Sequence, residues 1–232
     1  MFRIEDYLNL EQTAHASLFD ACGMPWDALK KLEDYLSAIS FHVDPSVDTR
    51  LAAFVGENVS IGEGTRIEAG AVILGPAVIG RNCHIRHGAY IRSNVIVGDE
   101  CVVGHGTELK QCLLFNQVMV PHMNYAGDAI FGFCSHLGAG AKISNVKWNN
   151  GVIRIDAEAT HGQKVETGLM KLGAIIGDHV EIGCNAVVSP GSVLGRHSVI
   201  YPNVLWRGVL PAHKLVKNLA QQSITDRLPD LG

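Results

Sequence analysis

The chain has 232 residues, of which 47% are hydrophobic and 18% charged, and its 19 Lys and Arg against 23 Asp and Glu leave a net charge of −4. This composition excludes a disordered chain, and charged residues break every apolar run well before the roughly 20 residues that a membrane span needs. Because no basic run is present, we expect neither nucleic acid nor a membrane as a partner, which leaves small molecules and further copies of the chain.

The cysteines and the first residues indicate a compartment. The six cysteines form no CxxC pair, and Glu5 and Asp6 fall where a signal peptide would be apolar. We therefore expect reduced thiols and a cytoplasmic protein.

Residues 25–39 predict a helix of about four turns. Pro25 is typical of a first helical turn, and the apolar residues that follow share one helical face: Leu29, Leu32, Leu36 and Ile39. We expect a helical cap over residues 1–48, in which this helix covers the open end of the next structure and shields its edge strand.

An aliphatic residue recurs at every sixth position through the middle of the chain. The uninterrupted series is Val55, Ile61, Ile67, Ile73, Ile79, Ile85, Ile91, Val97, Val103 and Leu109. A period of six fits neither an α-helix nor a hairpin strand, but it fits a triangular solenoid. Each hexapeptide then forms one short strand and one corner, and three hexapeptides form a coil that stacks about 4.8 Å from the next. We expect an all-β solenoid over residues 49–210, with the inward aliphatics as its core.

The six-residue period stops over residues 110–130 and again over residues 144–175. Because a solenoid interior is already filled, we expect both segments to be inserted loops that cover surface or build a site. In the second loop, Asn149-Asn150-Gly151 predicts the turn of a hairpin between residues 143–146 and 152–155. Residues 213–228 predict a looser C-terminal helix, within a tail of residues 211–232.

Arg92 and Lys110 are 18 positions apart, and each follows an inward aliphatic residue. Residues one full coil apart lie side by side on the same wall of a solenoid. Two stacked cations repel each other unless an anion lies between them, and a phosphate suits that position. The alternative is a solvated basic spot that Glu108 neutralises.

Together these features resemble the acetyltransferase half of the bifunctional N-acetylglucosamine-1-phosphate uridyltransferases. The resemblance rests on the hexapeptide repeat, Arg92, residues 108–110, 122–129 and 137–140, and Asn145. Residues 171–178 (KLGAIIGD) are similar to the archaeal-type sugar-phosphate nucleotidyltransferases that carry the same solenoid. The resemblance implies a left-handed parallel β-helix, a homotrimer with active sites between subunits, and acetyl transfer from acetyl-CoA to the amine of glucosamine 1-phosphate.

The resemblance also implies roles for residues on the acceptor side of this reaction. His122 matches the general base, and Glu108 matches the carboxylate that orients it. Arg92 and Lys110 match the phosphate contacts, and Tyr125 matches a sugar contact. No metal is implied.

Five further positions follow from the same resemblance. Asn145 is expected to bind substrate, and His136 stands where the family has a sugar-binding Asn. Ala139 lies where the backbone meets the thioester end of coenzyme A, and Cys184 stands where the family has a Ser near the acetyl group. The cosubstrate is expected in a groove near Cys184 and Pro202.

The chemistry of the residues agrees with these roles. An amine that attacks a thioester must lose a proton, and a neutral imidazole, with a reference pKa of about 6.5, suits the transfer at neutral pH. Backbone amides around Ala139 and Gly140 would stabilise the tetrahedral oxyanion. The alternative for His122 is a loop histidine that only caps local backbone.

Two other functions remain open. One is a non-catalytic or regulatory module that holds a sugar phosphate or nucleotide sugar and lacks a nucleotidyltransferase domain. The other is a zinc hydratase that resembles the solenoid carbonic anhydrases, because His87 and His105 are also 18 apart. In those enzymes a further His follows five residues after a Gly-His, whereas here that position is Lys110, so His87 and His105 are more simply residues of the wall.

Overall fold

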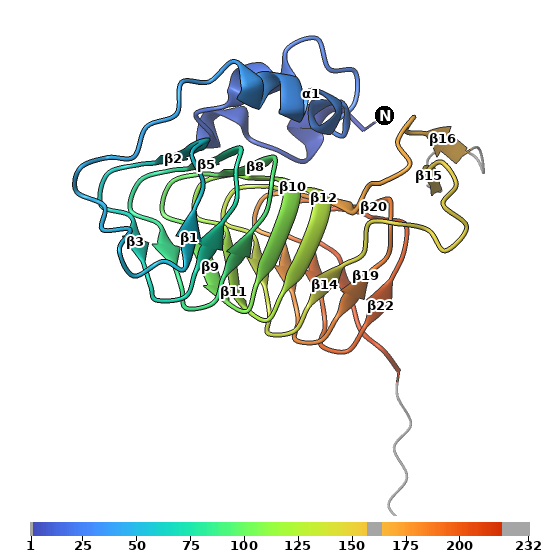
Figure 1. The fold of residues 1–232 in the computed structure, drawn as a ribbon. Helices are drawn as coiled ribbons and strands as arrows, with labels where there is room; N and C mark the ends of the chain where they lie inside the picture. The colour runs from blue at the N-terminus through green and yellow to red at the C-terminus, as the bar shows by residue number, and fades with distance from the viewer. Residues whose placement is uncertain (1, 157–163, 220–232) are drawn as a thin grey trace, which may run out of the picture.

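The structure, a computed structural model, describes residues 2–156 and 164–219. It contains a parallel β-solenoid whose short strands form three walls, with a helical N-terminal segment along one of them (Figure 1). Each strand of these walls pairs in parallel with the strand one coil away. The fold class that we predicted, a left-handed parallel β-helix, is confirmed.

Each wall is a ladder of short strands. The first wall contains β1 (Phe54–Val55), β4 (Val72–Ile73), β7 (Tyr90–Ile91), β10 (Glu108–Leu114), β12 (Tyr125–Phe131), β14 (Lys142–Ile143), β19 (Val187–Val188) and β22 (Leu205–Trp206). The second wall contains β2 (Val59–Ile61), β5 (Ala77–Ile79), β8 (Val95–Val97), the later halves of β10 and β12, β17 (Ala174–Ile176), β20 (Ser192–Leu194) and β23 (Val209–Leu210). The third wall contains β3 (Arg66–Ile67), β6 (His84–Ile85), β9 (Val102–His105), β11 (Met119–His122), β13 (His136–Leu137), β18 (Glu181–Ile182), β21 (Val199–Ile200) and β24 (Leu215–Val216).

The inward side chains form one continuous apolar column. Ile73, Ile91 and Leu109 are in register on neighbouring strands of the first wall, and all three are fully buried. Burying a side chain of this size contributes about 1.5–3 kcal/mol before the entropy of ordering is subtracted. The whole stack therefore holds the solenoid together, and it is the source of the six-residue period.

Residues 110–130 belong to the solenoid and are not the inserted loop that we predicted. The first and second walls join here without a break, because β10 and β12 are seven residues long and bend around the corner. Cys112 and Ala129 point into the core, and both are fully buried. The coil is one residue shorter, so that Glu108 pairs with Tyr125, 17 positions later. The six-residue spacing of inward side chains is therefore interrupted here, although the solenoid continues.

The N-terminal segment lies along the second wall (Figure 1), and not over the open end as we expected. Its elements are η1 (Ile4–Asp6), η2 (Leu10–Gln12), η3 (Ala16–Phe19) and α1 (Asp27–Ser37). Leu29 and Leu32 of α1 share a buried cluster with Ile96 and Leu113, which face outward from the second wall. Because this wall is apolar on both faces, the apolar face of the helix packs there. Within residues 2–156 and 164–219, no helix is both long and apolar enough to span a bilayer.

Extended segments lie at the two ends of the solenoid. At the start, Val43 pairs with Ile61, and Val47 packs against the core. At the other end, β24 pairs with β21 and extends the third wall by one strand. The described part of the predicted C-terminal helix, residues 213–219, is therefore not helical, and residues 220–228 lie outside the described residues.

The chain leaves the solenoid after β14 and returns at β17. This excursion contains an antiparallel pair, β15 (Arg154–Asp156) with β16 (Lys164–Glu166). The hairpin that we predicted between residues 143–146 and 152–155 is wrong, because β14 pairs inside the solenoid. Ile153 and Ile155 are buried in the cluster beneath α1, which fixes the base of the excursion against the second wall.

Candidate functional site

Arg92 directly follows β7 and Lys110 lies within β10, the adjacent strand of the first wall, as their spacing predicts. Ile91 and Leu109 are in register, and the Arg92 backbone N–H donates to the Leu109 carbonyl at 2.8 Å. The Arg92 side chain is 38% exposed and the Lys110 side chain 24% exposed. The two residues therefore lie one strand spacing apart on the same wall, and both side chains reach its surface.

Each of these cations has a carboxylate partner. The Arg92 guanidinium donates to Glu108 Oε1 at 2.8 Å, and this hydrogen bond and charge raise the pKa of Arg92. The Lys110 ammonium lies 3.5 Å from Asp128 Oδ2. An anion that binds both cations must compete with these carboxylates, and the longer Lys110 contact is the weaker of the two.

Asp128 is a site residue that we did not predict. It is 7% exposed, and its Oδ2 accepts a hydrogen bond from Asn145 Nδ2 at 2.5 Å. The Tyr125 hydroxyl in turn donates to Asn145 Oδ1 at 3.4 Å, and burial raises the pKa of that phenol. The signal in the sequence is the 17-residue spacing from Asp128 to Asn145, which becomes meaningful once the shorter coil is known.

His122 lies on the edge between the third and first walls. It ends β11, is exposed, and is in register with His105 of β9. The buried Asn124 fixes this corner, because its Oδ1 accepts from the His122 backbone N–H at 3.0 Å and its Nδ2 donates to the Gly138 carbonyl at 2.8 Å. Among the described residues, the His122 ring makes no hydrogen bond or ion pair, and the residue is exposed.

The same edge continues through the residues expected to meet coenzyme A. The carbonyl of His122 accepts a hydrogen bond from the Gly140 N–H at 2.9 Å. In the same way, the Ala139 carbonyl accepts from the Asn185 N–H and the Cys184 carbonyl from the Asn203 N–H, each at 2.9 Å. The Gly140 amide is therefore engaged, contrary to its expected role at an oxyanion. The Ala139 N–H has no protein partner in the part of the chain that the structure describes.

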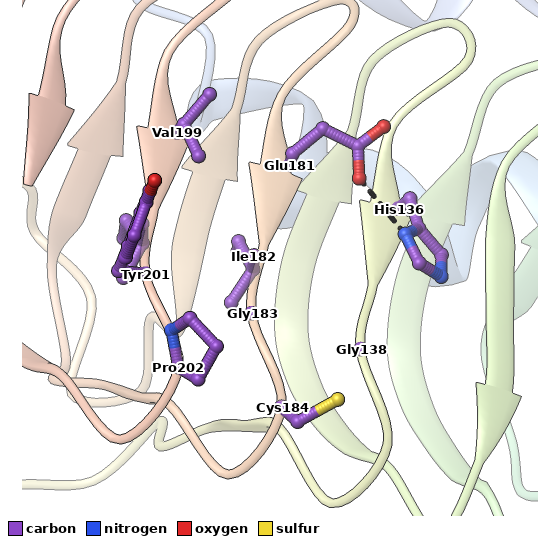
Figure 2. Close-up of a pocket in the computed structure, with 10 residues that line it drawn as sticks. His136, Gly138, Glu181, Ile182, Gly183, Cys184, Val199, Tyr201 and Pro202 are labelled. Carbon is purple, nitrogen blue, oxygen red and sulfur yellow. Dashed lines mark hydrogen bonds and ion pairs between the residues drawn. The ribbon is translucent and has the colours of Figure 1, made fainter.

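An open groove lies on the third wall beside this edge (Figure 2). Its lining is mostly apolar and includes Ile182, Tyr201 and Pro202, with Cys184 exposed at its rim. Gly138 lies in the lining, and a Cβ there would lie 2.6 Å from the Cys184 amide, so only glycine fits. A groove therefore lies near Cys184 and Pro202, and its use by the cosubstrate stays a prediction.

His136 lies in this groove and not with the cations of the first wall. Its Nδ1 is 2.8 Å from Glu181 Oε2, on the neighbouring strand (Figure 2). The structure thus separates His136 from Tyr125 and Asn145, with which we had grouped it as substrate contacts. A carboxylate–imidazole pair thus forms between Glu181 and His136, whereas among the described residues Glu108 and His122 make no such contact.

The histidines of the zinc hypothesis stack on one another. The rings of His87 and His105 lie 5.3 Å apart and nearly parallel. Their Nδ1 atoms lie 2.6 Å from the Ala69 carbonyl and 2.9 Å from the His87 carbonyl. A carbonyl only accepts, so each Nδ1 carries the proton. In residues 2–156 and 164–219, no three His, Cys, Asp or Glu side chains come together as a metal site.

Comparisons with known proteins show what the chain is similar to. Residues 73–168 match the family model of the GMPPB C-terminal domain, and residues 173–205 match the bacterial transferase hexapeptide (six repeats). Over 98 residues the chain is 31% identical to a bifunctional sugar-1-phosphate nucleotidylyltransferase/acetyltransferase of Sulfurisphaera tokodaii, covering 42% of this chain and 24% of that protein. Over 183 residues it is 36% identical to a bifunctional protein GlmU of Methanococcus maripaludis, and the match covers 79% of this chain and 43% of that protein.

Among solved structures, LpxA from Acinetobacter baumannii is similar with a TM-score of 0.40 and 17% identity, over 75% of this chain and 67% of that chain. The chain spans less than half the length of the two curated relatives above. The expected resemblance is confirmed: residues 173–205 carry the hexapeptide repeat, and the chain is similar to the acetyltransferase-containing part of sugar-1-phosphate nucleotidylyltransferase/acetyltransferases.

Proposed function

We propose that the protein is an N-acetyltransferase that moves the acetyl group of acetyl-CoA to the amine of an amino-sugar phosphate such as glucosamine 1-phosphate. One observation carries this proposal. A wall that presents Arg92 and Lys110 meets a wall with an apolar groove, and His122 lies on the edge between them. An acceptor on one wall and a thioester on the other would meet at that imidazole.

The first wall supplies the acceptor contacts. A phosphate that displaces Glu108 from Arg92 and Asp128 from Lys110 makes two charge-assisted interactions, and the net gain is smaller than the about 1.5–3 kcal/mol that each contributes, because the two carboxylate contacts are lost. Tyr125 and Asn145 lie on the same wall and offer polar contacts to the sugar.

The third wall supplies the donor contacts. The apolar groove suits the uncharged arm of acetyl-CoA, and Cys184 and Pro202 border it. The Ala139 N–H, next to the groove and without a partner among the described residues, would donate to the oxyanion of the tetrahedral intermediate.

The chemical step follows from this placement. The amine nitrogen attacks the thioester carbon while His122 takes the proton that the nitrogen loses. The C–S bond then breaks, the acetyl group remains on nitrogen as an amide, and the coenzyme A sulfur leaves as a thiolate that recovers the proton from His122.

We further propose that the protein is a cytoplasmic homotrimer with its sites between subunits, which the family resemblance supports. The first wall also carries exposed apolar side chains, with Phe54 52% and Leu205 71% exposed. Sedimentation equilibrium checks the trimer, because a monomer mass of 25.0 kDa predicts a threefold larger particle.

A binding module without chemistry is the second candidate. The observation that favours it is the absence of a carboxylate partner for the His122 ring among the described residues, since Glu108 is bonded to Arg92. A panel of amino-sugar phosphates with acetyl-CoA, scored by free thiol, tests the enzyme. Calorimetry with acetyl-CoA separates the two, because the module has no need to bind it.

A further inference from the structure

Asp128 lies where the chain bends from the first wall into the second. Its φ of 52° is in the left-handed region, which Asp tolerates better than most residues. Its carbonyl accepts from the Gly173 N–H at 2.7 Å, at the end of the excursion that begins after β14. Asp128 therefore connects β12 to both ends of that excursion, since its side chain holds Asn145.

In the hydrogen bonds that join Asp128, Asn145 and Tyr125, the donor and the acceptor of each bond can be assigned in only one way. The ionised carboxylate only accepts, so the atom of Asn145 that faces it must be the amide nitrogen. The amide oxygen of Asn145 then faces Tyr125 and can only accept, so the Tyr125 hydroxyl must donate to it. Burial raises the pKa of Tyr125 and keeps the phenol protonated for this role.

Gly127 permits this arrangement. A Cβ at position 127 would lie 2.5 Å from Asn145 Nδ2 and 2.8 Å from the Tyr125 hydroxyl, and neither can withdraw without losing its partner. Lys110 completes the cluster, because its ammonium is 3.5 Å from the same Asp128 oxygen that holds Asn145.

We infer that Asp128 determines acceptor specificity: through Asn145 it commits the proton of the Tyr125 hydroxyl to the protein, so that the Tyr125 oxygen accepts from a hydroxyl or ammonium group of the ligand. The inference rests on the proposed function for the identity of the ligand, an amino-sugar phosphate. Asp128 acts here as a positioning residue, and Tyr125 makes the contact.

The test is calorimetry with glucosamine 1-phosphate and its monodeoxy analogues. We expect wild-type protein to bind one analogue at least about tenfold more weakly than the parent compound. Tyr125→Phe, which removes only the hydroxyl, should bind the parent tenfold more weakly and no longer distinguish that analogue. Asp128→Asn, in which the side chain can also donate, should lose most of the same selectivity.

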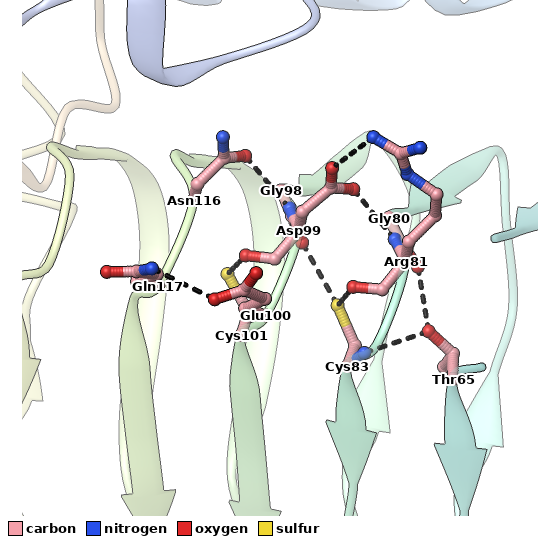
Figure 3. Close-up of polar contacts among 10 residues, drawn as sticks. All are labelled: Thr65, Gly80, Arg81, Cys83, Gly98, Asp99, Glu100, Cys101, Asn116 and Gln117. Atoms are coloured by element: carbon pink, nitrogen blue, oxygen red, sulfur yellow. Dashed lines mark hydrogen bonds and ion pairs between the residues drawn. The ribbon is translucent and has the colours of Figure 1, made fainter. Parts of the chain in front are cut away.

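The matched control is Asp99→Asn. Asp99 also bridges two coils, with its carboxylate 3.1 Å from the Arg81 guanidinium, but at a corner between the second and third walls (Figure 3). This variant should keep wild-type affinity and selectivity. Thermal unfolding of each variant shows whether it is folded, and Tyr125→Phe keeps the test decisive if Asp128→Asn does not fold.

The outcomes separate the inference from the proposed function. Wild-type selectivity that survives unchanged in folded Tyr125→Phe overturns the inference, as does a wild type that binds the parent and every monodeoxy analogue equally. Selective binding without coenzyme A release would refute the proposed function and leave the inference standing. Failure of wild-type protein to bind glucosamine 1-phosphate would refute both.

Discussion

The carboxylate of Glu108 accepts a hydrogen bond from the guanidinium of Arg92 at 2.8 Å and, within the described residues, none from the imidazole of His122. Under the proposed function, a phosphate that binds Arg92 competes with Glu108 for the same donor. A displaced Glu108 would then be available to the imidazole on the neighbouring edge. The role of Glu108 in orienting His122 therefore stays a proposal, tied to binding of the acceptor.

Removing either cation of the first wall should weaken acceptor binding alone. We expect Arg92→Gln and Lys110→Met each to raise the KM for glucosamine 1-phosphate about 10- to 100-fold, the equivalent of one lost charge-assisted contact. The KM for acetyl-CoA should stay within about twofold. Steady-state kinetics with each substrate varied in turn measures both values. Arg81→Gln, at a distant corner, is the control, and equal changes in both KM values would contradict the assignment.

The inward column should dominate stability. Leu109→Ala removes a fully buried side chain from the core, and we expect the free energy of unfolding to fall by about 2–5 kcal/mol. Leu215→Ala changes an outward side chain that is 50% exposed, and we expect a change within about 0.5 kcal/mol. Chemical denaturation measures the difference. Similar losses in the two variants would mean that the column does not carry the fold.

Stability should decrease between pH 7.5 and pH 5.5. Burial lowers the pKa of His15, and burial together with the neighbouring charges of His179 and His213 lowers the pKa of His197. Each of these histidines then binds fewer protons when folded than when unfolded. The free energy of unfolding therefore decreases as the pH falls below about 6.5, the pKa of histidine in the unfolded chain.

Denaturation at the two pH values measures this loss. His15→Gln removes one titrating group while offering a polar partner to the Tyr35 hydroxyl, which lies 2.9 Å from His15 Nδ1. This variant should show a smaller decrease than the wild type. A decrease of the same size would show that His15 does not contribute.

The sequence allowed much of the fold to be predicted, because most coils place an aliphatic residue inward at a fixed interval of six. The prediction failed where one residue is missing from a corner, near Cys112, since the period shifts although the strand continues. The surface covered by α1 could not be predicted from its apolar face alone. The sequence feature that indicates this surface lies in the solenoid, where the outward residues Ile96 and Leu113 of the second wall are apolar.

The candidate site was predictable to the extent that it depends on spacing. The adjacency of Arg92 and Lys110 follows from coil length alone. The hydrogen-bond partner of each side chain depends on the length and the rotamer of that side chain, and the spacing of residues in the repeat does not determine the rotamer. Glu108 therefore bonds Arg92 in the structure, and His136 bonds Glu181 on another wall.

The turnover of His122→Ala tests the central claim most directly. Coenzyme A release with acetyl-CoA and glucosamine 1-phosphate measures it, with sedimentation to show that assembly is unchanged. We predict that kcat falls by about 10²- to 10⁴-fold, the usual contribution of a general base. His105→Ala, on the same edge and in register one coil earlier, should keep kcat within about twofold. Turnover of His122→Ala within twofold of the wild type would contradict the proposed mechanism.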